Sequence, residues 1–375
     1  MAIAPTPSVL YNREIYIATL AVQRACLLTQ KVFTSKVTST QSKDDKSPVT
    51  IGDFGAQALI IKAIKHNFPN DGVIGEEDAT SLREKPELSK QVWEIVKGTR
   101  LSDKATEAEL GGPVRSEEEM WDMIDSGNSA GGPKGRIWAL DPIDGTLGFL
   151  RGGQYAVCLA LIKDGDVKVG VLGCPNLPAS EVDPLPENVG TGGWDGTEYG
   201  VKGNSWRGVL FSAALGQGSV SRPLDTGKLL PAKSIQMMNP EISEAKTCES
   251  VEAGHSSHSD NARILEKLNI TESAIRMDSQ AKYGSIARGA ADIYLRLPTS
   301  KSYVEKIWDH AAGDIIVREA EGWVTDVHGK RLDFSQGRTL SKNKGVVAAP
   351  IRIHWTVLKA VREVLEAKDP KDRAD

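Results

Sequence analysis

Residues 136–149 read RIWALDPIDGTLGF, and this stretch constrains the fold more than any other part of the chain. The apolar run 137–140 is typical of a buried strand, which we predict to end at Asp141. Asp144 follows three residues later, and Gly145 comes directly after it. A buried strand that ends in two carboxylates, a proline and a turn glycine suggests that the carboxylates bind something at the edge of a sheet.

The composition narrows the classes of protein to consider. The 375 residues suffice for two domains, and the formal net charge of −4 argues against a nucleic-acid or anionic-membrane partner. The four cysteines lie far apart without a CxxC pair, which suits a reducing compartment. The first residues contain no basic region followed by an apolar core. We therefore expect a soluble, cytoplasmic protein.

Apolar periodicity predicts the elements of the first part of the chain. One amphipathic helix is expected over 9–32 and another over 53–66, with Asp53 at its N-cap. The polar stretch 38–50, which contains a Ser-Pro pair, is predicted to be a loop or an exposed hairpin. Residues 79–118 are charged and weakly periodic, and we expect them to form a surface insertion with one helix.

The middle and the second half of the chain indicate an α/β layer. Residues 155–175 are predicted to form a hairpin whose turn is the dipeptide Asp164-Gly165. The stretch 178–205 is rich in Pro, Gly and Asn and is interpreted as a linker. It divides the chain into an N-terminal α+β domain (1–205) and a C-terminal domain (206–375) in which short strands alternate with helices.

Several carboxylates lie at the ends of predicted elements rather than on polar faces: Asp53, Glu76, Glu77, Asp141, Asp144 and Asp309. An all-oxygen cluster suits Mg²⁺, and clustered negative charge is costly unless a cation neutralises it. Two such ions can stabilise both the attacking and the leaving oxygen of a phosphoryl transfer. Taken singly, each motif has a simpler interpretation as a turn, an acidic loop or a helix cap. Only their combination favours a metal centre.

Three motifs together resemble the lithium-sensitive, Mg²⁺-dependent phosphatase superfamily of inositol monophosphatase and fructose 1,6-bisphosphatase. They are GEED (75–78), WALDPIDGTLGF (138–149) and KIWDHAAGDIIVREAEG (306–322). Within it, the chain is most similar to the fungal 3′(2′),5′-bisphosphate nucleotidases. The stretches that carry this similarity include DDKSPVTIGDF (44–54), GHSSH (254–258), DSQAKY (278–283) and ADIYLRLP (291–298). The resemblance implies a layered α/β/α/β/α sugar-phosphatase-like fold in two subdomains.

The resemblance also implies about two to three Mg²⁺ ions per active site. The first would be held by Glu76, Asp141 and the Ile143 carbonyl, and the second by Asp141, Asp144 and Asp309. A third, weaker ion would lie near Glu76 and Asp53.

The remaining site residues follow from the same motifs. Asp53 and Thr146 resemble the pair that orients and deprotonates the nucleophilic water, and Gly145 and Thr146 would offer backbone N–H groups to the scissile phosphate. The nucleoside and its second phosphate would contact His255, Ser279, Lys282 and Arg296. Leu147 departs from the pattern, since close relatives often carry lysine after DGT.

The implied activity is hydrolysis of 3′-phosphoadenosine 5′-phosphate to AMP and phosphate, with 3′-phosphoadenosine 5′-phosphosulfate as a related substrate and with inhibition by Li⁺ and Na⁺. The alternative enzyme is an inositol (poly)phosphate 1-phosphatase, which shares the metal centre. A non-catalytic sensor on the same scaffold is a second alternative, and zinc bound by the pair His255 and His258 a third. We expect a monomer whose partner is a small nucleotide.

Overall fold

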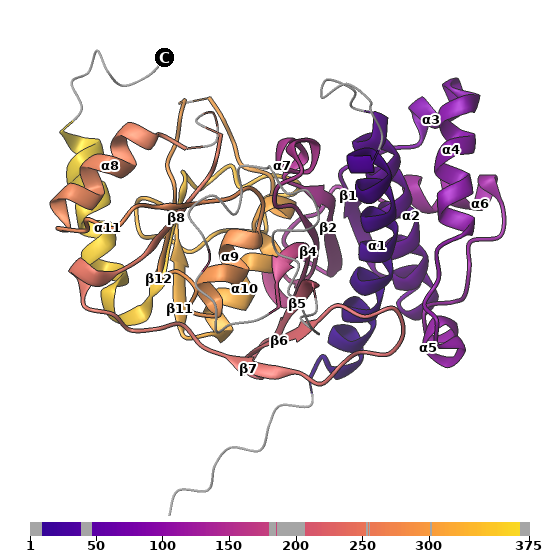
Figure 1. Ribbon diagram of the computed structural model, residues 1–375, viewed down its shortest axis with the longest axis horizontal. Coiled ribbons are helices and arrows are strands. Elements are labelled where there is room, and N and C mark those ends of the chain that lie inside the picture. Colours follow the sequence, from indigo (N-terminus) through magenta and orange to yellow (C-terminus); the bar gives the residue numbers. More distant parts are fainter. Residues whose placement is uncertain are drawn as a thin grey trace, which may run out of the picture.

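The computed structural model describes residues 10–38, 47–179, 185, 207–252, 254, 256–300 and 302–367. Two β-sheets alternate with three layers of helices (Figure 1). The layers along the long axis are α8 with α11, the second sheet, α9 with α10, the first sheet, and α1 with α2 (Figure 1). The predicted mixed α/β fold with five alternating layers is confirmed.

The first sheet has seven strands within the described residues, in the order of the chain. They are β1 (Gly72–Gly75), β2 (Arg136–Asp144), β3 (Ala156–Lys163), β4 (Asp166–Pro178), β5 (Arg207–Ala214), β6 (Ser219–Pro223) and β7 (Lys233–Ile235). Only the β1–β2 pair in this sheet is parallel. The predicted hairpin is confirmed as β3–β4, with positive φ angles of 53° at Asp164 and 77° at Gly165 that suit a two-residue turn.

The second sheet has the strand order β11-β12-β10-β8-β9. Its strands are β8 (Thr247–Glu249), β9 (Ile275–Arg276), β10 (Ile293–Arg296), β11 (Gly322–Thr325) and β12 (Val346–Pro350). β10 is the central strand, since it pairs with β12 on one side and with β8 on the other. Arg296, the last residue of β10, therefore lies on a strand that is hydrogen-bonded on both sides.

Helices cover the faces of both sheets. α1 (Asn12–Thr38) and α2 (Ser47–Asn67) pack together on the outer face of the first sheet, and α9 (Ala281–Ala287) and α10 (Ala311–Glu319) fill the space between the sheets (Figure 1). The outer face of the second sheet is covered by α8 (His258–Lys267) and α11 (Ile351–Glu366). The 3₁₀ turns are η1 (Ile242–Glu244) and η2 (Ile307–Asp309).

Asp53 is not the N-cap that the periodicity predicted. α2 begins at Ser47, so Asp53 lies in its second turn, and the predicted loop 38–50 contains helical residues at both ends. Residues 39–46 lie outside the described part of the chain. Pro48 does not end the helix, because the first turn of a helix needs no N–H at that position.

The prediction of one helix within the insertion 79–118 was wrong. This segment contains α3 (Thr80–Glu84), α4 (Pro86–Lys97) and α5 (Lys104–Glu109), and α6 (Glu117–Asp125) begins at its end. Short helices give little apolar periodicity, and side-chain caps define the boundaries of α5 and α6 instead. Asp103 accepts a hydrogen bond from the Thr106 N–H, and Ser116 accepts one from the Glu119 N–H.

The domain division at residues 205 and 206 stays a prediction. Beyond it, β5, β6 and β7 extend the first sheet, and the second sheet starts only at β8. Of the predicted linker 178–205, only residues 178, 179 and 185 are described.

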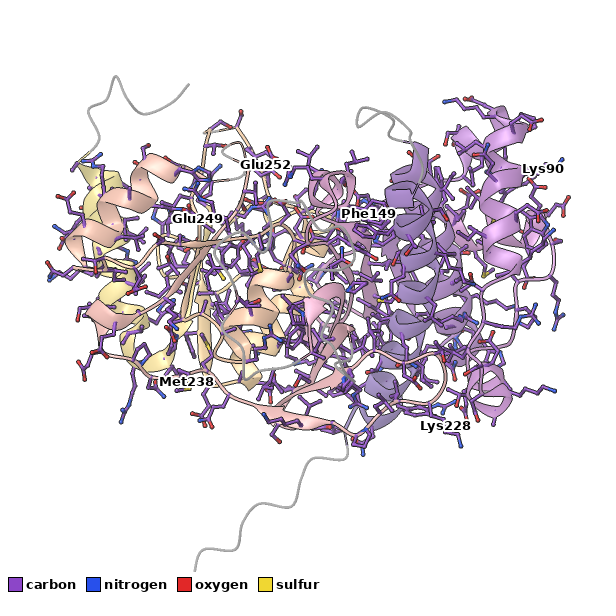
Figure 2. All side chains as sticks on the ribbon, in the orientation of Figure 1. Lys90, Phe149, Lys228, Met238, Glu249 and Glu252 are labelled. Carbon is purple, nitrogen blue, oxygen red and sulfur yellow. The ribbon has the colours of Figure 1, made fainter. Side chains whose placement is uncertain are left out.

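The core on the helical side of the first sheet contains an aromatic cluster. Phe149 belongs to α7 (Thr146–Arg151), and its ring makes edge contacts with Phe33 of α1 at 5.3 Å and with Tyr155 at 4.8 Å (Figure 2). All four cysteines are buried and unpaired. Among the described residues, none of the helices combines the length and the apolar character needed to cross a bilayer.

Candidate active site

β2 carries the two aspartates of the opening stretch to the same side of the sheet. The prediction that this strand ends at Asp141 was wrong, because β2 continues to Asp144 through a bulge. Asp141 pairs with Cys158, and Asp144 pairs with Ala156. Three steps along β2 therefore match two along β3. Residues three apart on a regular strand point to opposite faces, and one extra residue brings them to the same face.

Gly145 makes the sharp turn from β2 into α7. Its φ of 87° is a left-handed conformation, and a Cβ built on it would lie 2.9 Å from the Cβ of Ser279. Both the left-handed backbone conformation and the lack of space beside Ser279 therefore require glycine at this position. Thr146 is the first residue of α7, and its exposed side chain lines the pocket described below.

Glu76 follows β1 at the same edge of the sheet. Because β1 runs parallel to β2, the carboxyl ends of both strands meet there, which is where open α/β sheets bind ligands. The next residue is held by Gln57 of α2, whose Nε2 donates to the Glu77 carbonyl over 2.7 Å and whose Oε1 accepts from the Glu77 N–H over 3.1 Å. The loop that carries Glu76 is thus fixed to a buried helix.

Asp309 reaches the same place from the other half of the molecule, at the end of η2. Gln280 connects it to the first sheet. Its backbone N–H donates to Asp144 Oδ2 over 2.5 Å, and its side-chain Nε2 donates to the Trp308 carbonyl over 2.7 Å. Gln280 Oε1 accepts from the Gly313 N–H over 2.9 Å, so the segment around Asp309 is held on both sides.

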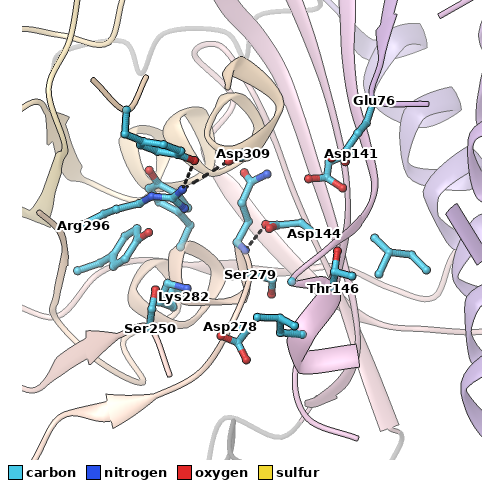
Figure 3. Close-up of a pocket in the computed structure, with 17 residues that line it drawn as sticks. Glu76, Asp141, Asp144, Thr146, Ser250, Asp278, Ser279, Lys282, Arg296 and Asp309 are labelled. Atoms are coloured by element: carbon cyan, nitrogen blue, oxygen red, sulfur yellow. Dashed lines mark hydrogen bonds and ion pairs between the residues drawn. The ribbon is translucent and has the colours of Figure 1, made fainter. Parts of the chain in front are cut away.

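One pocket brings together most of the predicted site residues (Figure 3). Those that line it are Glu76, Asp141, Ile143, Asp144, Gly145, Thr146, Ser279, Lys282, Arg296 and Asp309, together with Leu147. Asp53 does not line the pocket, but it is buried and interacts electrostatically with Glu76 and Glu77. His255 lies outside the described residues.

The acidic end of the pocket has perturbed titration behaviour. Burial, followed by repulsion from Asp309 and Glu77, raises the pKa of Glu76 to about 7. Burial and repulsion from Asp309 raise the pKa of Asp144 to about 6, although Lys282 and the Gln280 N–H oppose the shift. Burial, and then repulsion from Glu76 and Asp144, raises the pKa of Asp141 well above its ordinary value.

These carboxylates fit a hard divalent cation. They offer oxygen atoms only, and their negative charges destabilise one another as long as no cation lies between them. Asp141 Oδ1 is buried and has no hydrogen-bond partner among the described residues, so it presents an unused ligand atom. Glu76, Asp141, Asp144 and Asp309 are therefore the residues that could hold Mg²⁺.

The opposite end of the pocket is cationic (Figure 3). Lys282 is 3% exposed, and its Nζ donates to the Met277 carbonyl over 3.1 Å and lies 5.3 Å from the centre of the Tyr294 ring. Burial lowers the pKa of Lys282, while the charges of Asp278 and Asp144 oppose that shift. Arg296, at the end of β10, is the second cation. The pocket thus offers oxygen ligands at one end and anion-binding groups at the other.

Sequence reasoning missed four residues of this region: Gln280, Tyr283, Glu305 and His310. Gln280 and Tyr283 lie in the DSQAKY stretch and His310 in the WDHAAG stretch, so the motifs contained them without indicating a role. His258 does not point to zinc by its contacts, since its Nε2 is hydrogen-bonded to the Ser250 carbonyl at 3.0 Å. His255, the other half of that pair, is not described.

Comparisons with known proteins show which family this chain is similar to. Residues 11–366 match the model of the inositol monophosphatase family. The 3′(2′),5′-bisphosphate nucleotidase of Emericella nidulans is 61% identical over 95% of this chain and 99% of its own length. The protein of the same name from Schizosaccharomyces pombe is 45% identical over 96% of this chain and 98% of its own length.

Solved structures support the fold. SuhB of Mycobacterium tuberculosis superimposes with a TM-score of 0.54 at 18% identity, over 94% of this chain and 96% of its own. An inositol monophosphatase from Zymomonas mobilis gives 0.53 at 17% identity, over 95% of this chain and 100% of its own. At such identities the likeness concerns the arrangement of the chain alone.

Proposed function

The chain belongs to the inositol monophosphatase family, and from this premise we propose that it is a Mg²⁺-dependent phosphatase that removes the 3′-phosphate of 3′-phosphoadenosine 5′-phosphate to give AMP. The phosphosulfate analogue is the related substrate, and Li⁺ and Na⁺ are inhibitors. The high identity to a 3′(2′),5′-bisphosphate nucleotidase supports the substrate class. The observation that carries the proposal is a single pocket with carboxylates at one end and Lys282 and Arg296 at the other.

The acidic residues have the role of holding about two to three Mg²⁺ ions. Glu76, Asp141 and the Ile143 carbonyl would hold one ion, Asp141, Asp144 and Asp309 a second, and Glu76 with Asp53 a weaker third. When bound, Mg²⁺ supplies Lewis-acid activation of water and neutralises charge on the phosphate. The unpartnered oxygen of Asp141 supports this assignment.

Asp53 and Thr146 are proposed to manage the proton of the attacking water. The Thr146 hydroxyl orients the water, and Asp53 receives the proton. The raised pKa of Asp53, which results from burial and from the charges of Glu77 and Glu76, suits a group that accepts a proton. Gly145 and Thr146 offer their backbone N–H groups to the scissile phosphate, and Gly145 allows the chain to approach it closely.

Substrate recognition is assigned to the cationic end of the pocket. Lys282 and Arg296 would contact the second phosphate, Ser279 would contribute a hydroxyl, and His255 would lie near the nucleoside. A substrate that carries two separate phosphates on its ribose matches a pocket that binds anions by two different means.

We further propose that the protein acts as a cytoplasmic monomer. Four buried, unpaired cysteines support a reducing compartment, and the net charge of −4 provides no general attraction for nucleic acid or anionic membranes. Size-exclusion chromatography with light scattering tests the monomer directly.

The test of the activity is phosphate release in the presence of Mg²⁺. The substrates are 3′-phosphoadenosine 5′-phosphate, its phosphosulfate analogue, inositol 1-phosphate and inositol 1,4-bisphosphate, each with and without Li⁺ or Na⁺. We expect the two adenosine substrates to react fastest and both cations to inhibit. Preference for an inositol phosphate would overturn the substrate assignment, and equal rates with EDTA would overturn the metal dependence.

A further inference from the structure

Glu305, a further carboxylate beside those that could hold Mg²⁺, is paired with a cation of the chain itself. Glu305, Asp309 and His310 place one ligand atom each within 4.8 Å of one another, the only such cluster of His, Cys and acidic residues found in the described part of the chain. Arg296 occupies it: Nη2 lies 2.7 Å from Glu305 Oε2 and 3.5 Å from Asp309 Oδ2. We therefore interpret the cluster as a holder for Arg296.

Glu305 grips one edge of the Arg296 guanidinium. Nε donates to Glu305 Oε1 over 2.9 Å while Nη2 binds Oε2, which is the bidentate geometry of the strongest arginine–carboxylate pairs. Nη2 also donates to the Tyr303 hydroxyl over 3.3 Å. Within the described residues, no group accepts a hydrogen bond from Nη1. The bidentate pair with Glu305 thus leaves Arg296 Nη1 available for an anion in the pocket.

Glu305 is itself fixed by a chain of buried groups. His310 Nε2 lies 3.3 Å from Glu305 Oε2, and the Tyr283 hydroxyl lies 2.8 Å from His310 Nδ1. One tautomer satisfies all three: the phenol donates to Nδ1, and Nε2–H donates to the carboxylate. Burial raises the pKa of Tyr283, which keeps its proton on the oxygen. Tyr283 and His310 are fully buried, so water does not compete for these hydrogen bonds.

The opposite charges of Glu305 and Arg296 also favour this pairing. Burial alone would raise the pKa of Glu305, but its hydrogen bond to His310 and the charge of Arg296 lower it to about 2. Glu305 therefore favours its ionised form beside Arg296. A buried, ionised carboxylate next to an anion-binding pocket would repel a phosphate unless its charge were taken up. Arg296 takes it up, and the pair presents a guanidinium edge rather than a carboxylate to the pocket.

We propose that Glu305 is a positioning residue for substrate selection: it orients Arg296 toward the second phosphate, and His310 and Tyr283 hold it in place. This rests on the proposed function, in which Arg296 contacts that phosphate. Selection for a second anionic group would then depend on a carboxylate that never touches the substrate.

The test compares two substrates that differ only in the second phosphate, 3′-phosphoadenosine 5′-phosphate and 3′-AMP. For Glu305→Gln we expect KM for the bisphosphate to rise roughly tenfold, which is the lower end of the effect of losing a charge-assisted hydrogen bond. We expect kcat/KM for 3′-AMP to change less than about twofold. In an Arg296→Gln background, Glu305→Gln should have no further effect, since Glu305 acts through Arg296. Glu305→Asp should restore part of the affinity.

The matched control is Glu107→Gln, which changes another buried glutamate paired with an arginine, Arg24, at 2.9 Å and outside the pocket. It should lower the melting temperature without changing the ratio of the two substrates. If Glu305→Gln does not fold, Tyr283→Phe tests the same support and should raise KM for the bisphosphate alone.

The outcomes separate this inference from the function on which it rests. A wild type that hydrolyses both substrates equally well overturns the proposed function, and the inference with it. A wild-type preference for the bisphosphate that survives Glu305→Gln overturns the inference alone. The same holds if Glu305→Gln slows both substrates equally, or if its effect persists undiminished when Arg296 is absent.

Discussion

Gln280 donates its backbone N–H to Asp144 over 2.5 Å and thereby joins the second half of the chain to a carboxylate of the first sheet. Its side chain makes two more hydrogen bonds, to the Trp308 carbonyl and from the Gly313 N–H, on either side of Asp309. One buried amide thus sets the separation of two predicted metal ligands. Outer groups of this kind typically matter almost as much as the ligands.

Gln280→Ala should weaken Mg²⁺ binding roughly 10- to 100-fold, because Asp309 loses its fixed position relative to Asp144. The measurement is the Mg²⁺ dependence of the melting temperature, with isothermal titration as a second readout. Gln23→Ala is the matched control, since Gln23 is also a buried amide bonded to a main-chain carbonyl, that of Gly227. Equal Mg²⁺ affinity in both variants would contradict the role of Gln280.

Asp144→Asn should reduce kcat by at least roughly 1,000-fold while the fold is retained, because a neutral amide is a poor ligand for Mg²⁺. Without metal, the variant should be at least as stable as the wild type, since it removes one of the mutually repelling carboxylates. Thermal unfolding followed by circular dichroism in EDTA checks the stability, and steady-state kinetics in Mg²⁺ check kcat. Normal turnover would rule out the assignment of two ions.

Thr146→Val removes the hydroxyl and nearly preserves the shape of the side chain. We expect kcat to fall roughly 100- to 10,000-fold, as is typical for loss of a group that helps transfer a proton, with little change in KM. Thr146→Ser keeps the hydroxyl and should retain most of the activity. If the valine and serine variants behave alike, the hydroxyl has no catalytic role.

Gly145→Ala should be harmful for geometric reasons. The φ of 87° disfavours any side chain with a Cβ, and that Cβ would meet Ser279 at 2.9 Å. We expect a loss of about 1–3 kcal/mol in the free energy of unfolding together with weaker substrate binding. Gly112→Ala is the control, because Gly112 also has a positive φ, 70°, but nothing lies within 4 Å of its Cβ position. Equal stability losses would show that strain alone is responsible.

The metal-free protein should lose stability as pH rises from about 5 to about 7. Glu76, with a pKa of about 7, and Asp144, with a pKa of about 6, keep protons in the folded state that the unfolded chain has already released. Because the folded state binds more protons in this window, raising the pH favours unfolding. Thermal melts in EDTA should show this slope, and saturating Mg²⁺ should abolish it. An unchanged slope in Mg²⁺ would contradict the assigned ligands.

The sequence predicted the layered architecture, and most of the residues that it proposed for the site line one pocket. The β3–β4 hairpin was found because Asp164-Gly165 is a local turn signal that needs no tertiary information. Asp141, Asp144 and Asp309 were found because their motifs are recognisable as a set, and the pocket brings them together. Local periodicity alone would not have connected Asp309 of η2 with the two aspartates of β2.

What the sequence did not predict depends on tertiary contacts or on short elements. The bulge between Asp141 and Asp144 is visible only in the pairing with β3, so the strand was expected to end early. The helices of 79–118 are too short for a clear apolar period. The hydrogen-bond partners of Gln280 and Glu305 lie between 5 and 136 residues away in the sequence, a relation that no local pattern encodes.

The predicted metal ligands come from two distant parts of the fold, and this has a consequence for the thermal unfolding of the protein. Asp141 and Asp144 belong to β2 of the first sheet and Glu76 directly follows β1, whereas Asp309 ends η2, between β10 and β11 of the second sheet. A cation held by these residues would require both parts of the fold to be formed and packed together. Its binding free energy would therefore stabilise the packing of the two parts as well as each part alone. Calorimetry should therefore show a single sharp transition in Mg²⁺, and a broader or two-step transition in EDTA.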